Sequence, residues 1–506
     1  MKHYPLLLIT AIVFLSTFSL GETTALINNA NAAEPMTILG IYVHGFFLLM
    51  AVGLPYLVLT YEFLGIRKNN KEYLDAAKKL STVWGISFAI GAATGTLVEF
   101  GLVQIWSGTL VAIGSFFFAP LVIELFAFMI EIVFLAVYLF TWDSKKPSWV
   151  HFSFGIILLF ASNFSAYLIL AANSFMNVPW GTGDLVSKIL PWMPSLGQNY
   201  VNQTALANLY VALQNKGTLA LIQYSLSNQI GIIFYNPIIP LENPDLYATF
   251  IHTVLATIII ASFEASAFIA LDYLKRSNER NYRMKLLRVS YGVGSVASIL
   301  MAFSGDFMGR IVYQYNVLKF VAFEGLGNAG GKDPIMGILL YGNPNYTFPG
   351  FNYYLGLANS SIDPNAVISS VMDARAFASW GYYVYWSMVI SGIILFIFAI
   401  IYFASYSSYL QKLFKKIFRI PIQDFLVYSS FAAPILGLIA ASAGWAVREA
   451  GRHPWAIYGL IQYWQIITPN QITFGFSALI IAVELAILFF GSYAIIYFMR
   501  VRRDKK

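Results

Sequence analysis

Long runs of apolar residues, separated by shorter polar stretches, dominate the chain. Nine of these runs are long enough to cross a bilayer as a helix, which takes roughly 20 residues at a rise of about 1.5 Å per residue. They lie near residues 38–64, 81–105, 111–141, 150–174, 248–272, 286–304, 378–404, 423–446 and 472–499. The runs are continuous rather than alternating with a period of two, so they predict an all-α polytopic membrane helix bundle and not a barrel.

The composition agrees with a membrane protein. Of the 506 residues 58% are hydrophobic and 11% are charged, against about 25% charged in soluble domains. The chain has no cysteine, which excludes disulfides, thiolate metal sites and iron–sulfur clusters. The partner that this composition predicts is membrane lipid, and we expect no nucleic-acid partner.

The net charge of +7 is distributed in a way that predicts the orientation of the helices. Most of the 31 lysines and arginines fall in five groups that lie on one side if the nine spans alternate. Such positive loops usually face the cytoplasm. The groups are Arg67, Lys68, Lys71, Lys78 and Lys79; Lys145 and Lys146; Lys275, Arg276, Arg280, Arg283, Lys285 and Arg288; Lys412, Lys415, Lys416 and Arg419; and Arg500, Arg502, Arg503, Lys505 and Lys506. We therefore expect a multi-pass cell-membrane protein with its amino end outside and its carboxyl end in the cytoplasm.

The pattern also divides the chain. Residues 1–33 resemble a secretory signal, because an apolar stretch follows Lys2 and small residues precede Ala33; the segment is either cleaved or an extra helix. Six helices follow in residues 34–304, with an extended outer loop at 178–247. A second outer loop spans 305–377, and three helices with a basic tail occupy 378–506. Both loops are rich in tyrosine, phenylalanine and isoleucine, so we expect ordered caps.

Two of the five histidines, His44 and His252, fall in apolar segments, within the first turns of the predicted helices on the outer side. Each is either a hydrogen-bonded packing residue or an axial ligand of haem iron, since an apolar helical bundle is where a porphyrin is held. Met388 lies at a similar depth in the seventh span. A methionine there is usually packing, but a His/Met pair would hold a low-spin haem.

Three carboxylates lie in the predicted helices. Glu99 ends the second span, and Glu124 and Glu131 are seven residues apart in the third. Seven residues are about two turns, so these two share one face. The apolar parts of the helices offer almost no lysine or arginine as a partner, and a line of carboxylates through an apolar bundle is typical of a proton path.

A second charged stretch ends the eighth span, which reads Gly-Trp-Ala-Val-Arg-Glu-Ala-Gly-Arg-His-Pro-Trp from Gly444 to Trp455. It places Glu449 and Arg452 close to hydrocarbon. Ionisable residues in such places mark a functional site or an ion pair.

Taken together, these stretches resemble subunit I of the cytochrome bd quinol oxidases from about residue 38 to 499. The shared stretches run in the same order and topology. They are Tyr42–Phe47, Gly85–Phe100, Ala119–Glu124 with Glu131, Trp142–Asp143, Ser162–Ala166, Phe250–Val254, Ser304–Asp306 and Gly451–Trp455.

The resemblance implies three haems near the outer face: a low-spin haem b, a high-spin haem b, and haem d or a further haem b in its place. It implies that His252 and Met388 ligate the low-spin haem, and that His44 and Glu449 serve the other two, in either order. It places Trp445, Arg452 and Glu99 beside that pair, with Arg452 meeting a propionate.

The resemblance further implies a quinol site in the loop after the sixth span, with Lys319 and Glu324 at the family's spacing of five residues. The carboxylate would accept a proton from quinol and the ammonium would orient a ring oxygen. The implied enzyme is an electrogenic ubiquinol or menaquinol oxidase that reduces oxygen to water with cytoplasmic protons. Its expected partner is a second membrane subunit, either subunit II or a paralogue of subunit I.

The chain departs from the family pattern at two positions. His453 stands where the family usually has glutamine, and Trp386 replaces an arginine two residues before Met388; Arg375 or Arg310 is a candidate substitute. Two alternative functions are a proton- or cation-coupled transporter, which predicts internal symmetry and broken helices, and a haem-less scaffold paralogue.

Overall fold

The computed structural model describes residues 25–142, 148–206, 208, 236, 238–275, 279–468 and 470–499. The predicted signal segment up to residue 24, Asp143 and much of the 178–247 loop lie outside these residues. So do several of the basic residues used for the orientation, namely Lys145, Lys146, Arg276, Arg500, Arg502, Arg503, Lys505 and Lys506.

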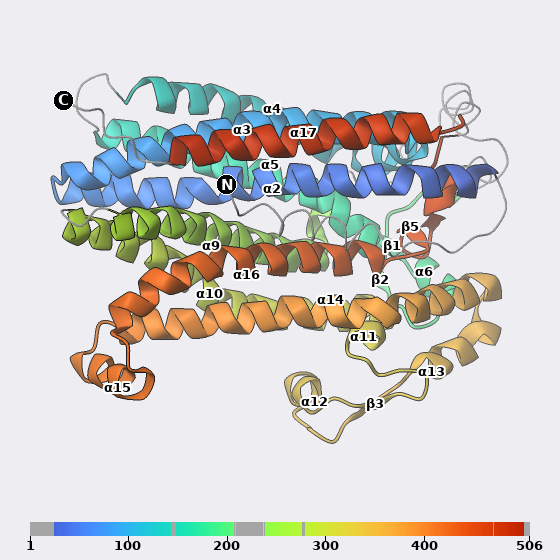
Figure 1. Ribbon diagram of the computed structural model, residues 1–506. Coiled ribbons are helices and arrows are strands. Elements are labelled where there is room, and N and C mark those ends of the chain that lie inside the picture. Colours follow the sequence, from blue (N-terminus) through green and yellow to red (C-terminus); the bar gives the residue numbers. More distant parts are fainter. Residues whose placement is uncertain are drawn as a thin grey trace.

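Within the described residues, nine long helices are apolar enough to span a membrane, which confirms the predicted all-α bundle. They run nearly parallel to one another (Figure 1). Their bounds are α2 Ala25–Arg67, α3 Lys71–Gln104, α4 Ser107–Phe140, α5 Trp149–Asn177, α9 Pro244–Lys275, α10 Arg280–Tyr315, α14 Pro364–Ala404, α16 Ile422–Ala450 and α17 Phe474–Met499.

Several helices extend beyond the predicted apolar runs. Helix α10 continues to Tyr315 and α14 begins at Pro364, so the segment between them is shorter than the predicted 305–377 loop. Helix α2 begins at Ala25, and His44 therefore lies about five turns inside it rather than in its first turns. The Asn29 side chain is buried and donates to the main-chain oxygens of Thr468 and Asn470. These polar contacts hold the start of α2 against the chain before α17, and hydrophobicity alone does not predict them.

Short elements gather at one end of the bundle, which we call the loop end. They are β1 Thr182–Gly183, α6 Leu185–Ile189, β2 Leu196–Asn199, η1 Ile239–Glu242, α11 Val317–Phe323, β3 Gly331–Lys332, α12 Pro334–Tyr341, β4 Thr347–Phe348, α13 Phe351–Gly356, η3 Leu357–Ser360, β5 Trp455–Ile457, β6 Ile461–Gln462 and η4 Tyr463–Gln465. The strands form three antiparallel pairs, β1 with β2, β3 with β4 and β5 with β6. Buried apolar side chains join several of these elements to the helix ends.

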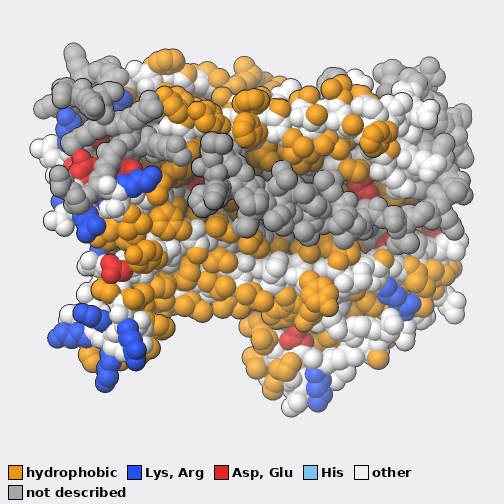
Figure 2. All heavy atoms as spheres, viewed as in Figure 1, with side chains coloured by type: hydrophobic (Ala, Val, Ile, Leu, Met, Phe, Trp, Pro, Cys, Tyr) orange, Lys and Arg blue, Asp and Glu red, His pale blue; other side chains and the backbone are white. Residues whose placement is uncertain are grey.

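The opposite end, which we call the basic end, carries α15 Ser408–Phe418 with Lys412, Lys415 and Lys416. Figure 2 shows lysine and arginine gathered at this end and a mainly hydrophobic surface along the middle of the bundle. That separation is what a bilayer demands, because charged side chains avoid the hydrocarbon layer.

Small residues set how closely the central helices pack. A Cβ at Gly53 of α2 would lie 2.1 Å from the main-chain oxygen of Thr257 on α9. Only glycine allows this approach, and membrane helices commonly use small residues to bring backbones together. The contact fixes α2 beside α9, and these two helices carry His44 and His252.

Candidate functional site

A cluster of charged and amide side chains lies where α16 ends at the loop end. Arg448 forms an ion pair with Asp245 at the start of α9, with 2.7 Å between Nη2 and Oδ2. The Arg448 Nε donates to Asn173 Oδ1 of α5, and Asn173 Nδ2 donates to Glu449 Oε1 at 2.7 Å. Glu449 Oε2 accepts a bond of 2.8 Å from Arg452 Nη2. Side chains from three helices thus orient the Glu449 carboxylate.

Arg452 has spare donors. It is 7% exposed, and its Nε and Nη1 have no hydrogen-bond partner within the part of the chain that the structure describes. Burial lowers its pKa, while the Glu449 carboxylate opposes this shift. Unpaired buried guanidinium donors are costly, so this position suits an anionic oxygen such as a haem propionate.

Trp445 and His453 flank this part of the chain. The Trp445 Nε1, one turn before Glu449, is also buried with no partner among the described residues. Burial, followed by the charge of Arg452, lowers the pKa of His453 to about 4, so its imidazole is neutral at pH 7. The residue that replaces the family's glutamine therefore adds no charge.

His44 is held in one tautomer. Its Nδ1 lies 3.1 Å from the main-chain oxygen of Gly91 and 3.2 Å from Thr94 Oγ1, both on α3. A carbonyl oxygen only accepts, so Nδ1 carries the hydrogen and the lone pair lies on Nε2. Histidines that bind a metal through one ring nitrogen typically donate a hydrogen bond from the other, as Nδ1 does here. A Cβ at Gly95 would lie 3.0 Å from His44 Cε1, so the glycine gives the ring its space.

His252 and Met388 lie on α9 and α14, which both pack against α16. His252 Nδ1 is 3.1 Å from Ser304 Oγ on α10, an arrangement that leaves Nε2 available. The Met388 sulfur faces α16, where a Cβ at Gly444 would lie 3.0 Å from it. The residues present fit an iron ligand set of imidazole and thioether.

The three carboxylates of the predicted proton path differ in their surroundings. Glu131 is buried, with 5% of its surface exposed, whereas Glu99 is exposed. Glu124 Oε1 accepts a hydrogen bond of 2.8 Å from Ser165 of α5. Ser162 of α5 is a hydrogen-bond partner of the Glu131 carboxyl. The Glu124 and Glu131 carboxyls thus lie along the α4–α5 contact, where α5 supplies hydroxyl groups.

Lys319 and Glu324 are not brought together. The Lys319 Nζ turns into the bundle and donates to the main-chain oxygen of Arg448 at 2.9 Å and to Asn177 Oδ1 at 3.2 Å. Burial is the largest of several causes that lower its pKa to about 7. Glu324 lies at the end of α11, where burial, and then the nearby Asp333 carboxylate, raise its pKa to about 8. Both values lie close to neutrality, which suits groups that exchange protons.

Arg375 and Arg310, the suggested substitutes for the missing arginine, make their contacts elsewhere and not with Trp386 among the described residues. Arg375 donates to Asn352 Oδ1 at 2.8 Å, and Arg310 pairs with Asp306. The Trp386 Nε1 is buried without a partner in this part of the chain.

Sequence reasoning missed Arg448, Asp245, Asn173 and Asn177. The signal that could have found the first two was present, because Arg448 and Asp245 are ionisable residues at the same predicted outer level of two apolar segments. The asparagines carry no such signal. Their role follows only from the folded chain, in which Asn173 contacts Glu449 of α16 and Asn177 accepts a hydrogen bond from Lys319 of α11.

The fold and this cluster define a polytopic membrane protein with charged, histidine and methionine side chains at and between its helices. Comparison with known proteins gives its family. The model of the family described as cytochrome bd terminal oxidase subunit I matches residues 36–505, and the chain belongs to this family. It is thus a subunit of a terminal oxidase, and relatives that are quinol oxidases support this enzyme class.

Two relatives from Bacillus subtilis cover nearly the whole chain. Cytochrome bd ubiquinol oxidase subunit 1 is 25% identical over 481 residues, which are 92% of this chain and 91% of the relative. A putative cytochrome bd menaquinol oxidase subunit I is 24% identical over 472 residues, with shares of 90% and 93%. A solved structure of bd oxidase from Geobacillus thermodenitrificans matches with a TM-score of 0.71 and 22% identity, covering 93% of this chain and 98% of that one. This last likeness concerns the fold.

Proposed function

We propose that this chain is the haem-carrying subunit of an electrogenic quinol oxidase. It oxidises quinol at the loop end, which faces outward, and reduces oxygen to water with protons drawn from the cytoplasm at the basic end. The observation that carries the proposal is the Glu449–Arg452 pair, in which a fixed carboxylate lies beside two buried guanidinium donors that have no partner among the described residues.

In this proposal His252 and Met388 bind a low-spin haem b, while His44 and Glu449 serve a high-spin haem b and haem d, or a further haem b in its place. Bound haems supply electron transfer and the site of oxygen reduction. Arg452 and Trp445 position their propionates through the donors described above. The Gly91 carbonyl keeps His44 in the tautomer that a ligand requires.

The protein's own groups handle the protons. Glu324 accepts a proton from quinol, and Lys319 stabilises the nearby carboxylate cluster at the end of α16 while contributing a polar group to the quinol region. Glu131 and then Glu124 pass protons from the basic end toward Glu99 and the haem pair. Charge then moves across the membrane without a pump. Each elementary charge moved against the membrane potential stores about 2.3 kcal/mol per 100 mV. A second membrane subunit, subunit II or a subunit I paralogue, completes the complex.

The test is a reduced-minus-oxidised visible spectrum of the complex, expressed with its partner under haem-replete conditions. Haem b bands with a red-shifted chlorin band are expected, together with quinol-dependent oxygen consumption. Haem b bands alone would remove haem d and keep the quinol chemistry. A complex without haem would overturn the proposal and favour a transporter or scaffold.

Two variants sharpen this test. His252→Ala is expected to remove the low-spin haem signal. His453→Gln serves as the matched control, because a neutral histidine is replaced by a neutral amide in the same cluster, and its spectrum is expected to stay unchanged.

A further inference from the structure

A buried polar cluster lies far from the haem-ligand candidates, toward the basic end. Glu62 of α2 contacts His151 at the start of α5, with 2.6 Å between Oε1 and Nδ1. Tyr138 near the end of α4 donates its hydroxyl to Glu62 Oε2, also at 2.6 Å. Glu62 and Tyr138 are 0% exposed and His151 is 5% exposed. Buried ionisable groups in a membrane segment need a function or a partner.

The donors and acceptors of this cluster can be assigned one by one. His151 Nε2 lies 3.0 Å from the main-chain oxygen of Tyr138, which only accepts, so Nε2 carries a hydrogen. The remaining contact joins His151 Nδ1 and Glu62 Oε1 at 2.6 Å. If His151 were neutral and Glu62 ionised, both of these atoms would be acceptors and no hydrogen would lie between them. A proton must therefore lie between Nδ1 and Oε1. The Glu62–His151 pair holds one proton that either atom can carry.

The pair is in register with the glutamates of the proposed proton path. Tyr138, Glu131 and Glu124 are spaced by seven residues on α4, so they lie on one face at intervals of about 10 Å. On α5, His151 and Ser162 are eleven residues apart, which is about three turns and again one face. Because α4 and α5 pack against each other, the pair continues the line of carboxyls toward the basic end.

Further polar atoms lie beside the pair. The indole rings of Trp84 and Trp142 each pack edge-on against the Tyr138 ring, with centroids 5.7 Å apart. Both indole nitrogens are buried and have no hydrogen-bond partner within the described residues. The same is true of the hydroxyl of Ser87, one turn from Trp84. Buried donors of this kind are commonly satisfied by ordered water, which can carry protons over the interval to Glu131.

We propose that the Glu62–His151 pair is the proton-loading site of the oxidase. One proton leaves the Nδ1–Oε1 contact for Glu131 through water, and one proton from the aqueous phase at the basic end replaces it. No electron is transferred in this step. The inference rests on the proposed function, since it supplies the protons that oxygen reduction consumes.

The experiment uses the complete oxidase complex with Glu62→Gln and His151→Gln. Each variant is expected to lower oxygen consumption at least tenfold, to slow proton uptake measured with a pH indicator, and to raise the solvent isotope effect. Haem spectra are expected to stay unchanged. Ser153→Ala, an exposed change on the first turns of α5, is the matched control and should match the unmodified complex.

Glu131→Gln separates the two proposals. Slow turnover in Glu131→Gln with normal turnover in Glu62→Gln overturns the loading site alone. Normal turnover in both overturns the proton path of the proposed function as well. If Glu62→Gln fails to assemble, Tyr138→Phe removes a single hydrogen bond, and an unchanged rate and isotope effect in that variant would count against the pair.

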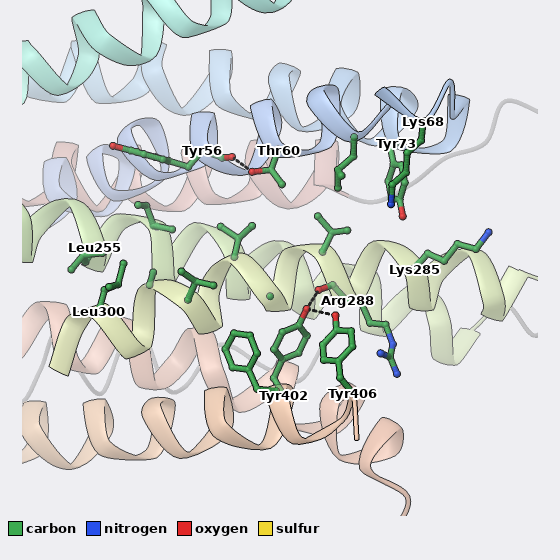
Figure 3. Close-up of a pocket in the computed structure, with 18 residues that line it drawn as sticks. Tyr56, Thr60, Lys68, Tyr73, Leu255, Lys285, Arg288, Leu300, Tyr402 and Tyr406 are labelled. Atoms are coloured by element: carbon green, nitrogen blue, oxygen red, sulfur yellow. Dashed lines mark hydrogen bonds between the residues drawn. The ribbon is translucent and has the colours of Figure 1, made fainter. Parts of the chain in front are cut away.

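The surface of the bundle carries a groove that is separate from the Glu62–His151 pair. A groove of about 630 Å³ runs between α2, α9, α10 and α14. In Figure 3, Lys68, Lys285 and Arg288 lie toward one end of it, and Leu255 and Leu300 lie toward the other. The groove thus has a cationic mouth at the basic end and apolar walls deeper in the bundle.

The mouth keeps net positive charge. The Arg288 guanidinium lies 5.5 Å from the centre of the Tyr406 ring, and the Lys68 ammonium lies 5.9 Å from that of Tyr73. Lys285 is 3.8 Å from Glu72, a long and solvent-exposed ion pair that contributes little. Three cations therefore face one carboxylate, which favours an anionic head group.

We infer that the groove binds an anionic diacyl phospholipid. Arg288 and Leu300 are twelve residues apart, or about 18 Å along α10, close to the thickness of one leaflet of a core about 30 Å thick. An acyl chain fits the space, and the cations meet the phosphate.

The test is a thermal unfolding assay of the detergent-purified complex with vesicles of phosphatidylglycerol or phosphatidylcholine. A rise in Tm of several degrees with phosphatidylglycerol only is expected, and it should disappear in Lys285→Gln/Arg288→Gln. Lys415→Gln/Lys416→Gln, on α15 at the same end, is the control and should keep the response. An equal rise in Tm with both lipids, or a rise with inorganic phosphate alone, would overturn the inference. So would a small membrane polypeptide found in the groove.

Discussion

The Arg448 guanidinium and the Asp245 carboxylate form a buried ion pair that joins the end of α16 to the start of α9. Their side chains are 11% and 3% exposed, and the nitrogen–oxygen distance is 2.7 Å. The residue after Arg448 is Glu449, and His252 lies two turns after Asp245. One ion pair therefore sets the relative position of two helices that carry candidate haem ligands.

Removing one partner of this pair is expected to destabilise the protein. Asp245→Asn leaves the Arg448 charge buried without its carboxylate, which typically costs about 3–5 kcal/mol. The measurement is the thermal unfolding of the purified complex. Asp306→Asn is the control, because its pair with Arg310 is half exposed and such pairs contribute about 0–1 kcal/mol. Equal losses in the two variants would contradict the structural role of the Asp245 pair.

Gly444 is expected to be sensitive to the smallest enlargement. In Gly444→Ala the new Cβ would lie 3.0 Å from the Met388 sulfur, so the methionine must move or α16 must shift. Such overpacking typically lowers the free energy of unfolding by about 1–3 kcal/mol. If Met388 ligates the low-spin haem, the midpoint potential and the α-band of that haem should change. Gly392→Ala lies on the same helix as Met388, and its new Cβ has no atom of the described residues within 4 Å. This variant should leave both the potential and the α-band unchanged.

Gly95 gives a parallel prediction for His44. The Cβ of Gly95→Ala would lie 3.0 Å from Cε1 of the His44 ring, and an imidazole cannot bend out of the way as a thioether can. We expect altered carbon monoxide difference spectra, since this histidine is proposed to serve the haem pair that binds oxygen. Gly101→Ala on the same helix meets no described atom within 4 Å and provides the comparison. Identical spectra in both variants would count against the assignment of His44.

The rate of quinol oxidation should rise with pH between about 7 and 9. The pKa of Glu324 is raised to about 8, so the group is mostly protonated at pH 7 and becomes a base as the pH rises through 8. Glu324→Gln should remove this rise. Asp333→Asn should move it to lower pH, because it removes a carboxylate that raises the pKa of Glu324, while asparagine still caps α12. An unshifted profile in Asp333→Asn would exclude Glu324 as the group responsible.

The sequence predicted the membrane helices well and their ends less well. Long apolar runs report burial in hydrocarbon, which is a local property, and all nine predicted helices are present among the described residues. The extension of α2 back to Ala25 was missed because it depends on Asn29, whose partners lie more than 400 residues away.

The candidate site divides in the same way. The residues that carry distinctive chemistry, such as His44, Met388 and Glu449, could be picked from the sequence because polar or soft side chains stand out in apolar segments. Lys319 and Glu324 are paired by the family resemblance, through their spacing and their place in the loop after the sixth span. In the folded chain Lys319 points to the oxygen of Arg448 and Glu324 remains at the end of α11.

Hydropathy and residue chemistry along the chain thus predicted a membrane bundle of nine helices, its charge asymmetry and most of the candidate ligands. The residues that contact one another are known only from the folded chain: Asn173 meets Glu449, the Gly91 carbonyl meets His44, and Glu62 meets His151. The physical reason is that hydropathy depends on each residue and its neighbours in the chain, whereas hydrogen bonds between helices depend on rotation and depth. Those are fixed by close packing at positions such as Gly53, where backbone meets backbone.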